Sequence, residues 1–284
     1  MILLPLVISA VGHACWDFVL AWLVRNDPDA SIIHMIWLRL TITAVSLYIL
    51  SPKSSGLETH STFWWLRFAL FGHVIPSLMY CLSVLWTGYR ISVSFQPFVP
   101  LLVALRTKST FTEYRSAALT LTMLGTLSIW SGVAWHQELW SVWIAIFASV
   151  LHVLSVTEWF IMLGSVEKDH MAHVSKGAMI AVILMFSLLI VWNPQHIAAA
   201  YVDRIDTWFA IVTAGALCIA CKFWVVAKYS GTMSPDSIAI FECIHPIATL
   251  VTDILTGNDF FEWRDALACF LYFSGWILYP KKNI

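Results

Sequence analysis

Ten apolar stretches follow one another along this chain almost without gaps, and each is long enough to cross a lipid bilayer. A helix needs about 20 residues to span the hydrocarbon core, and only helices or closed barrels satisfy their backbone polar groups there. We therefore expect an all-α integral membrane protein. Its ten transmembrane helices are predicted near residues 2–24, 31–50, 63–86, 91–106, 113–133, 139–163, 172–192, 206–228, 234–256 and 263–279.

The composition favours the same class of protein. Of the 284 residues, 60% are hydrophobic and 12% are charged, whereas soluble domains carry about 25% charged residues. The formal net charge of −1 gives no reason to expect a nucleic-acid partner. The six cysteines all lie in apolar stretches, where they are expected as small buried side chains rather than disulfides. We expect the lipid bilayer as a partner and no cofactor.

The distribution of Lys and Arg predicts the orientation. With ten spans both termini lie on one side, and the basic residues near span ends are concentrated on that side. The positive-inside rule then places both termini in the cytoplasm. The membrane is either a bacterial inner membrane or a eukaryotic endomembrane such as the endoplasmic reticulum. The closing residues 281–284, Lys-Lys-Asn-Ile, are similar to a dilysine retrieval signal and serve equally well as a basic anchor.

A weak internal repeat divides the chain into two halves, residues 1–133 and 139–284. Residues 94–100 align with 240–246 at a shift of 146 positions, which pairs Gln96 with Glu242. His13 and His152 occupy matching places in the first and sixth spans. Because five spans is an odd number, two such halves must insert in opposite orientations. Inverted repeats with a site at their interface are typical of secondary transporters.

Several short motifs occur in the order found in one transporter family. Residues 13–17, His-Ala-Cys-Trp-Asp, resemble the H-A-x-W-N start of that family, with Asp17 in place of Asn. Arg39 resembles its second-span arginine, and Pro100 and Pro246 fit its proline positions in spans four and nine. The glycine-containing last span resembles its closing helix. The whole chain thus resembles the EamA-like branch of the drug/metabolite transporter superfamily.

The resemblance implies a secondary-active transporter that works by alternating access through a central cavity between the halves. The expected solute is a small polar organic molecule such as an amine or an amino acid, with coupling to H⁺ or Na⁺ left open. A nucleotide-sugar or sugar-phosphate carrier of an organelle membrane is the alternative. An intramembrane enzyme is disfavoured because neither H-E-x-x-H nor G-x-S-x-G occurs, and a channel because no filter motif occurs. A monomer and a homodimer are equally compatible with the sequence.

Ionisable residues at membrane depth are costly and mark either a pathway or a pair. Asp17 and Arg39 lie at similar depths from one side, and Lys222 and Glu242 from the other. We expect two ion pairs, Asp17–Arg39 and Lys222–Glu242, because an unpaired buried charge is strongly unfavourable. The pairs serve either helix packing or the transport pathway.

Further polar and aromatic residues belong to the candidate cavity. Glu242, His245, Thr249 and Asp253 recur at helical spacing, and Gln96 matches Glu242 in the first half. The histidines are either neutral hydrogen-bonded groups or parts of a proton pathway. The Cys218–Cys221 pair lacks enough partners for a metal site, and we expect no bound metal.

Aromatic rings beside the acidic residues favour a cationic or zwitterionic amine as solute. The complete set of candidate lining residues is Asp17, His13, Trp16, Arg39, Tyr80, Gln96, His152, Lys222, Glu242 and His245.

Overall fold

The computed structural model describes most of the chain, and every regular element in its described part is a helix. The described residues are 3–26, 32–51, 60–87, 89–108, 112–132, 139–192, 205–255 and 262–279. The helices are α1 (Leu3–Asn26), α2 (Ile32–Leu50), α3 (Thr62–Ala69), η1 (Leu70–Val74), α4 (Ile75–Thr87), α5 (Tyr89–Ser94), α6 (Phe98–Arg106), α7 (Glu113–Gly132), α8 (Leu139–Gly164), α9 (His170–Trp192), α11 (Ile205–Ser230), α12 (Pro235–Ala239), η2 (Ile240–Cys243), α13 (His245–Leu255) and α14 (Trp263–Leu278). The prediction of an all-helical protein is confirmed over this part of the chain.

Five helical segments are long and apolar enough to cross a membrane. They are Ile33–Leu50, Thr62–Trp86, Trp140–Gly164, His170–Val191 and Val212–Ser230. Large apolar side chains point outward from them, including Phe147 at 64% and Ile183 at 65% exposure. An apolar surface of this kind suits lipid better than water, so the segments indicate a membrane protein.

Two of the predicted spans are broken rather than continuous. The predicted span 91–106 consists of α5 and α6, separated by a turn at residues 95–97. The predicted span 234–256 consists of α12, the 3₁₀ turn η2 and α13. Proline explains why a helix starts anew in each, because Pro97 is the N-cap of α6 and Pro246 lies in the first turn of α13.

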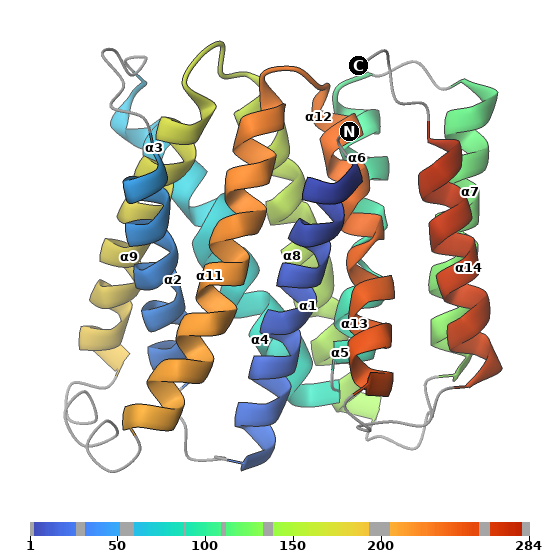
Figure 1. Ribbon diagram of the computed structural model, residues 1–284, viewed down its shortest axis with the longest axis horizontal. Helices are drawn as coiled ribbons and strands as arrows, with labels where there is room; N and C mark the ends of the chain where they lie inside the picture. The colour runs from blue at the N-terminus through green and yellow to red at the C-terminus, as the bar shows by residue number, and fades with distance from the viewer. Residues whose placement is uncertain are drawn as a thin grey trace.

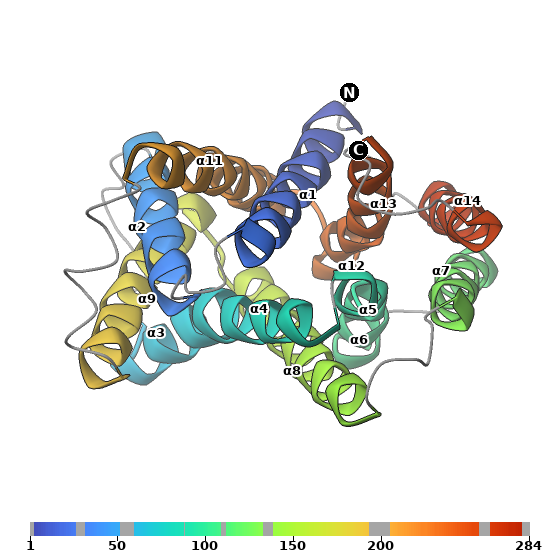
Figure 2. The ribbon, with the colours of Figure 1, turned by 90° about the horizontal axis from the view of Figure 1, so that it is seen from below.

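The helices lie side by side in one bundle, and the first turn of α1 and the last turn of α14 are at the same end (Figure 1). Seen along the bundle, α2, α3, α9 and α11 form one side and the pair α7 and α14 the other, with α1, α4, α8 and the broken helices between them (Figure 2). The closest packing joins α1 to α11, α4 to α8, α2 to α9 and α7 to α14.

Glycine allows two of these pairs to approach closely. A Cβ on Gly12 of α1 would come within 2.8 Å of the carbonyl oxygen of Cys218 in α11. A Cβ on Gly275 of α14 would come within 2.7 Å of the carbonyl oxygen of Ala118 in α7. Because lipid supplies no hydrophobic force between helices, close backbone packing at small residues is a main source of their association.

Candidate functional site

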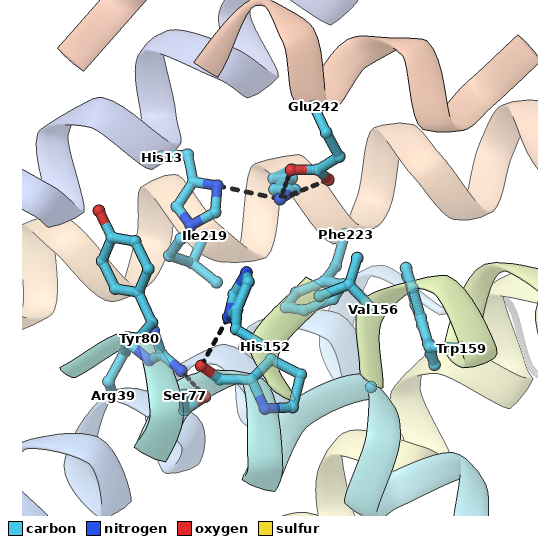
Figure 3. A pocket seen from close by; sticks show the side chains of 13 residues that line it. His13, Arg39, Ser77, Tyr80, His152, Val156, Trp159, Ile219, Phe223 and Glu242 are labelled. Atoms are coloured by element: carbon cyan, nitrogen blue, oxygen red, sulfur yellow. Dashed lines mark hydrogen bonds and ion pairs between the residues drawn. The ribbon is translucent and has the colours of Figure 1, made fainter. Parts of the chain in front are cut away.

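A cavity of about 50 Å³ lies between helices of the bundle (Figure 3). Helices α1, α2, α4, α8 and α11, the π-helical segment η1 and the 3₁₀ turn η2 contribute its walls. The lining residues are His13, Arg39, Gly72, Pro76, Ser77, Tyr80, His152, Val156, Trp159, Ile219, Lys222, Phe223 and Glu242. One water molecule needs roughly 10–15 Å³ measured in this way, so the cavity holds only a few waters in this conformation.

Lys222 and Glu242 form the ion pair that the sequence predicts. The Lys222 ammonium lies 2.8 Å from Oε1 of Glu242, and it donates hydrogen bonds of 3.1 Å to Oε2 of Glu242 and 2.9 Å to Nδ1 of His13. An ammonium has no acceptor, so Nδ1 of His13 must be unprotonated and the ring is the neutral Nε2–H tautomer. The ammonium therefore has a carboxylate partner and two hydrogen-bond acceptors, which compensates the desolvation of both charges.

The predicted Asp17–Arg39 ion pair is wrong. Oδ2 of Asp17 instead accepts hydrogen bonds of 2.5 Å from Nε2 of His245 and 2.7 Å from the Thr249 hydroxyl. His245 and Thr249 lie one turn apart on α13, so both reach the same carboxylate oxygen of α1. Equal depth in the membrane suggested Arg39 as the partner, but depth does not specify which helix faces which.

Arg39 has a different environment. Its guanidinium donates to the Ser77 hydroxyl, which in turn donates to the carbonyl oxygen of His73, and it lies 4.8 Å from the centre of the Trp16 ring. Among the described residues, no carboxylate lies within ion-pair distance of this guanidinium. Arg39 is 6% exposed, so its positive charge is held by one hydroxyl and one ring face.

His152 connects the first broken span to α4. Its Nδ1 lies 2.9 Å from the carbonyl oxygen of Pro76, so Nδ1 carries the proton, and its Nε2 lies 2.8 Å from Nε2 of Gln96. Nε2 of the imidazole then accepts from the Gln96 amide, which makes the ring neutral. Gln96 lies in the turn between α5 and α6, as Glu242 lies in the turn η2.

Six of the predicted site residues line the cavity, and the other four stand directly behind it. The lining residues are His13, Arg39, Tyr80, His152, Lys222 and Glu242. Trp16 lies beneath Arg39, and Gln96 supports His152. His245 stacks on His13 with ring centres 3.7 Å apart and holds Asp17. The side chain of Asp253 lies outside the described part of the structure.

Several lining residues were not predicted. They are Gly72, Pro76, Ser77, Val156, Ile219 and Phe223. Apolar residues at membrane depth carry no signal that separates cavity from lipid or core. Ser77 alone offered one, since a hydroxyl inside an apolar span requires a polar partner.

His13, Glu242 and His245 have ligand atoms that all lie within 4.8 Å of one another, a spacing that could hold a metal ion. The Lys222 ammonium already binds two of these residues and would repel a second cation. Cys218 and Cys221 contribute nothing to this group.

The comparisons with known proteins give a fold and no family. No family model and no curated protein matches the chain. One solved structure, described as "Crystal structure of protein", is similar over 98% of this chain and 99% of its own length. Its TM-score is 0.71 and its sequence identity is 12%, so the likeness shows the fold alone.

Proposed function

We propose that this protein is a secondary-active transporter of the EamA-like type, with ten membrane-spanning segments arranged as two inverted halves, residues 1–133 and 139–284. A small polar organic solute would cross through the central cavity by alternating access. In this arrangement each helix of the first half has a counterpart in the second half. The counterparts are α1 and α8, α2 and α9, α3–α4 and α11, α5–α6 and α12–α13, and α7 and α14.

The broken helices carry this proposal. Gln96 and Glu242, aligned by the shift of 146 residues, both lie in the interruption of a broken span. Gln96 binds His152, and Glu242 reaches the matching His13 through Lys222. Discontinuous helices at corresponding places in two halves are typical of the substrate and ion sites of transporters.

Helix packing supports the same relationship. Helix α1 packs on α11, and its counterpart α8 packs on α4; α1 also packs on α13, and α8 on α6. The remaining close pairs, α2 with α9 and α7 with α14, each join counterparts. Helices α1 and α8 run in opposite directions through the bundle, as inverted halves require (Figure 1).

Two ion pairs between the halves are suited to act as gates at opposite ends. Arg90, the second residue of α5, lies 3.4 Å from Asp265, the third residue of α14. Asp236, the second residue of α12, lies 3.0 Å from Arg115, the third residue of α7, and accepts a hydrogen bond of 2.7 Å from Tyr279. Helices α12 and α5 lie at opposite ends of the bundle (Figure 1). The tighter, more buried pair is at the end shared by the termini, which we propose is cytoplasmic.

The cavity also bears on the size of the solute. A volume of about 50 Å³ with two cationic side chains suits a small molecule, and a nucleotide sugar would need a far larger opening and more phosphate ligands. Amines and amino acids therefore remain the proposed solutes, with coupling to H⁺ or Na⁺ as alternatives for the driving force.

Counterflow in proteoliposomes tests the proposal. Vesicles preloaded with one unlabelled solute are exposed to a trace of the same labelled solute, taken in turn from small amines, amino acids, carboxylates, sugars and nucleotide sugars. A carrier gives transient, saturable accumulation, and protein-free vesicles give none. Linear, unsaturable flux would indicate a channel, and absence of exchange across all five classes would contradict the proposal.

A further inference from the structure

Arg39 is a buried charge of the cavity that contacts no carboxylate among the described residues, and the charge of Asp17 acts on it only from beyond ion-pair distance. Its Nε has no hydrogen-bond partner, and its remaining contacts are the Ser77 hydroxyl and the Trp16 ring. Buried charges are normally paired, because desolvation without compensation costs several kcal/mol. A guanidinium that lines a cavity without a carboxylate partner is therefore set up to receive an anion.

The unpartnered polar atoms of the cavity wall are hydrogen-bond donors. Within the described part of the wall they are Nε of Arg39 and Nε1 of Trp159, whereas the Tyr80 hydroxyl interacts with Asp17. Arginine and tryptophan nitrogens can only donate. The Arg39 and Trp159 side chains are 6% and 3% exposed, so bulk water does not satisfy them.

The acceptors of the cavity are already used. Both oxygens of Glu242 and Nδ1 of His13 bind the Lys222 ammonium, which is chemically an amine that the protein itself supplies. Figure 3 shows Glu242 and His13 on one wall, and Arg39 and Ser77 on the opposite wall. A simple amine would have to displace Lys222, whereas an anion finds Arg39 unoccupied by any carboxylate.

We propose that Arg39 anchors the anionic group of the transported solute, and that this group is a carboxylate. A carboxylate matches the planar fork of one guanidinium in shape and charge, while a phosphate dianion would need further cations. The apolar side chains of Val156, Ile219 and Phe223 provide a surface for a short hydrocarbon body. This assignment rests on the proposed carrier function and replaces the cationic amine by a carboxylate or a zwitterion.

The test compares three ligands of equal shape and different charge: propionate, propionamide and propylamine. The melting temperature of the purified protein is measured with each, at ionic strength matched with sodium chloride. Ligands that bind the folded state raise this temperature. We expect propionate alone to raise it. Its affinity should fall at least about tenfold in Arg39→Gln, since hydrogen bonds to charged groups contribute about 1.5–3 kcal/mol.

Two further variants keep the test decisive. Arg106→Gln, at an exposed side chain outside the cavity, should leave the propionate response unchanged. Arg39→Lys keeps the charge and should restore only part of the response, which remains informative if Arg39→Gln does not fold. Equal responses to propionate and propylamine, or a propionate response that persists in both Arg39 variants, would overturn the assignment.

Counterflow separates this inference from the carrier function. Exchange of amines that is unaffected by Arg39→Gln would refute the carboxylate anchor and leave the carrier standing. Propionate binding that depends on Arg39, without exchange of any solute, would refute the carrier and leave the anion site standing.

Discussion

Lys222 donates a hydrogen bond of 2.9 Å to Nδ1 of His13, although 209 positions separate them in the chain. The same ammonium pairs with Glu242 from the turn η2 between α12 and α13. One lysine thus ties α11 to α1 and to η2. In the same way, the carbonyl oxygen of Pro76 in α4 accepts from Nδ1 of His152 in α8. Each histidine therefore uses Nδ1 to contact a neighbouring helix.

Lys222→Met should destabilise the protein by about 3–5 kcal/mol, because it leaves the Glu242 carboxylate buried without its cation. The double variant Lys222→Met with Glu242→Gln should recover most of that loss, since no unpaired charge remains. Denaturant unfolding in detergent measures both values. A double variant no more stable than Lys222→Met would contradict the pairing.

A double-mutant cycle should distinguish the observed partner of Asp17 from the one predicted by depth. Asp17→Asn combined with His245→Gln should show a coupling energy of about 1–3 kcal/mol, as expected for groups in direct contact. The cycle of Asp17→Asn with Arg39→Gln should show a smaller coupling energy. The reverse order would mean that Arg39 is the true partner.

Gly72→Ala should destabilise the protein by roughly 1–3 kcal/mol, the usual cost of overpacking. A Cβ at this position would overlap the indole ring of Trp159 across the wall of the cavity. Gly231→Ala is the matched control, because its nearest contact would be 3.6 Å, an ordinary van der Waals distance. Equal melting temperatures for Gly72→Ala and the unmodified protein would show that the indole moves aside at no cost.

The two ion pairs that we propose as gates should control access from opposite sides. In a cysteine-free protein carrying Val156→Cys in the cavity wall, Asp236→Asn should increase maleimide labelling from the end that holds the termini. Asp265→Asn should increase labelling from the other end, because each change weakens one closed contact. Membrane-impermeant maleimide applied to vesicles of known orientation measures both rates. A change in the same direction for both variants would argue against paired gates.

The ten-span topology can be tested by labelling outside the cavity. Thr232 and Lys168 are exposed in connections after α11 and α8, and Ser131 is exposed at the end of α7. Single cysteines at Thr232 and Lys168 should react from the cytoplasmic face, and a cysteine at Ser131 only from the opposite face. Reaction of all three positions from one face would exclude the proposed arrangement.

Apolar length was enough to predict an all-helical protein and the bounds of several long helices. The predicted ranges 31–50, 139–163 and 172–192 agree with α2, α8 and α9 to within a few residues. The sequence also indicated which residues belong to the polar site. A charged side chain at membrane depth has a high free-energy cost in any helix, so each one marks a functional or paired group. The breaks in spans four and nine were less evident, because proline predicts a disturbance of the helix and not the turn that results.

The sequence alone identified the charged residues within apolar stretches, among them Lys222, Glu242, Asp17 and Arg39. Tertiary structure decided their partners. Lys222 and Glu242 are 20 positions apart on consecutive helical segments. Their pairing could be predicted because consecutive segments joined by a short loop pack side by side. Asp17 meets His245 across 228 positions, where the partner depends on how α1 and α13 rotate and pack. Periodicity specifies a helix, and packing against neighbouring helices selects the face that each polar side chain meets.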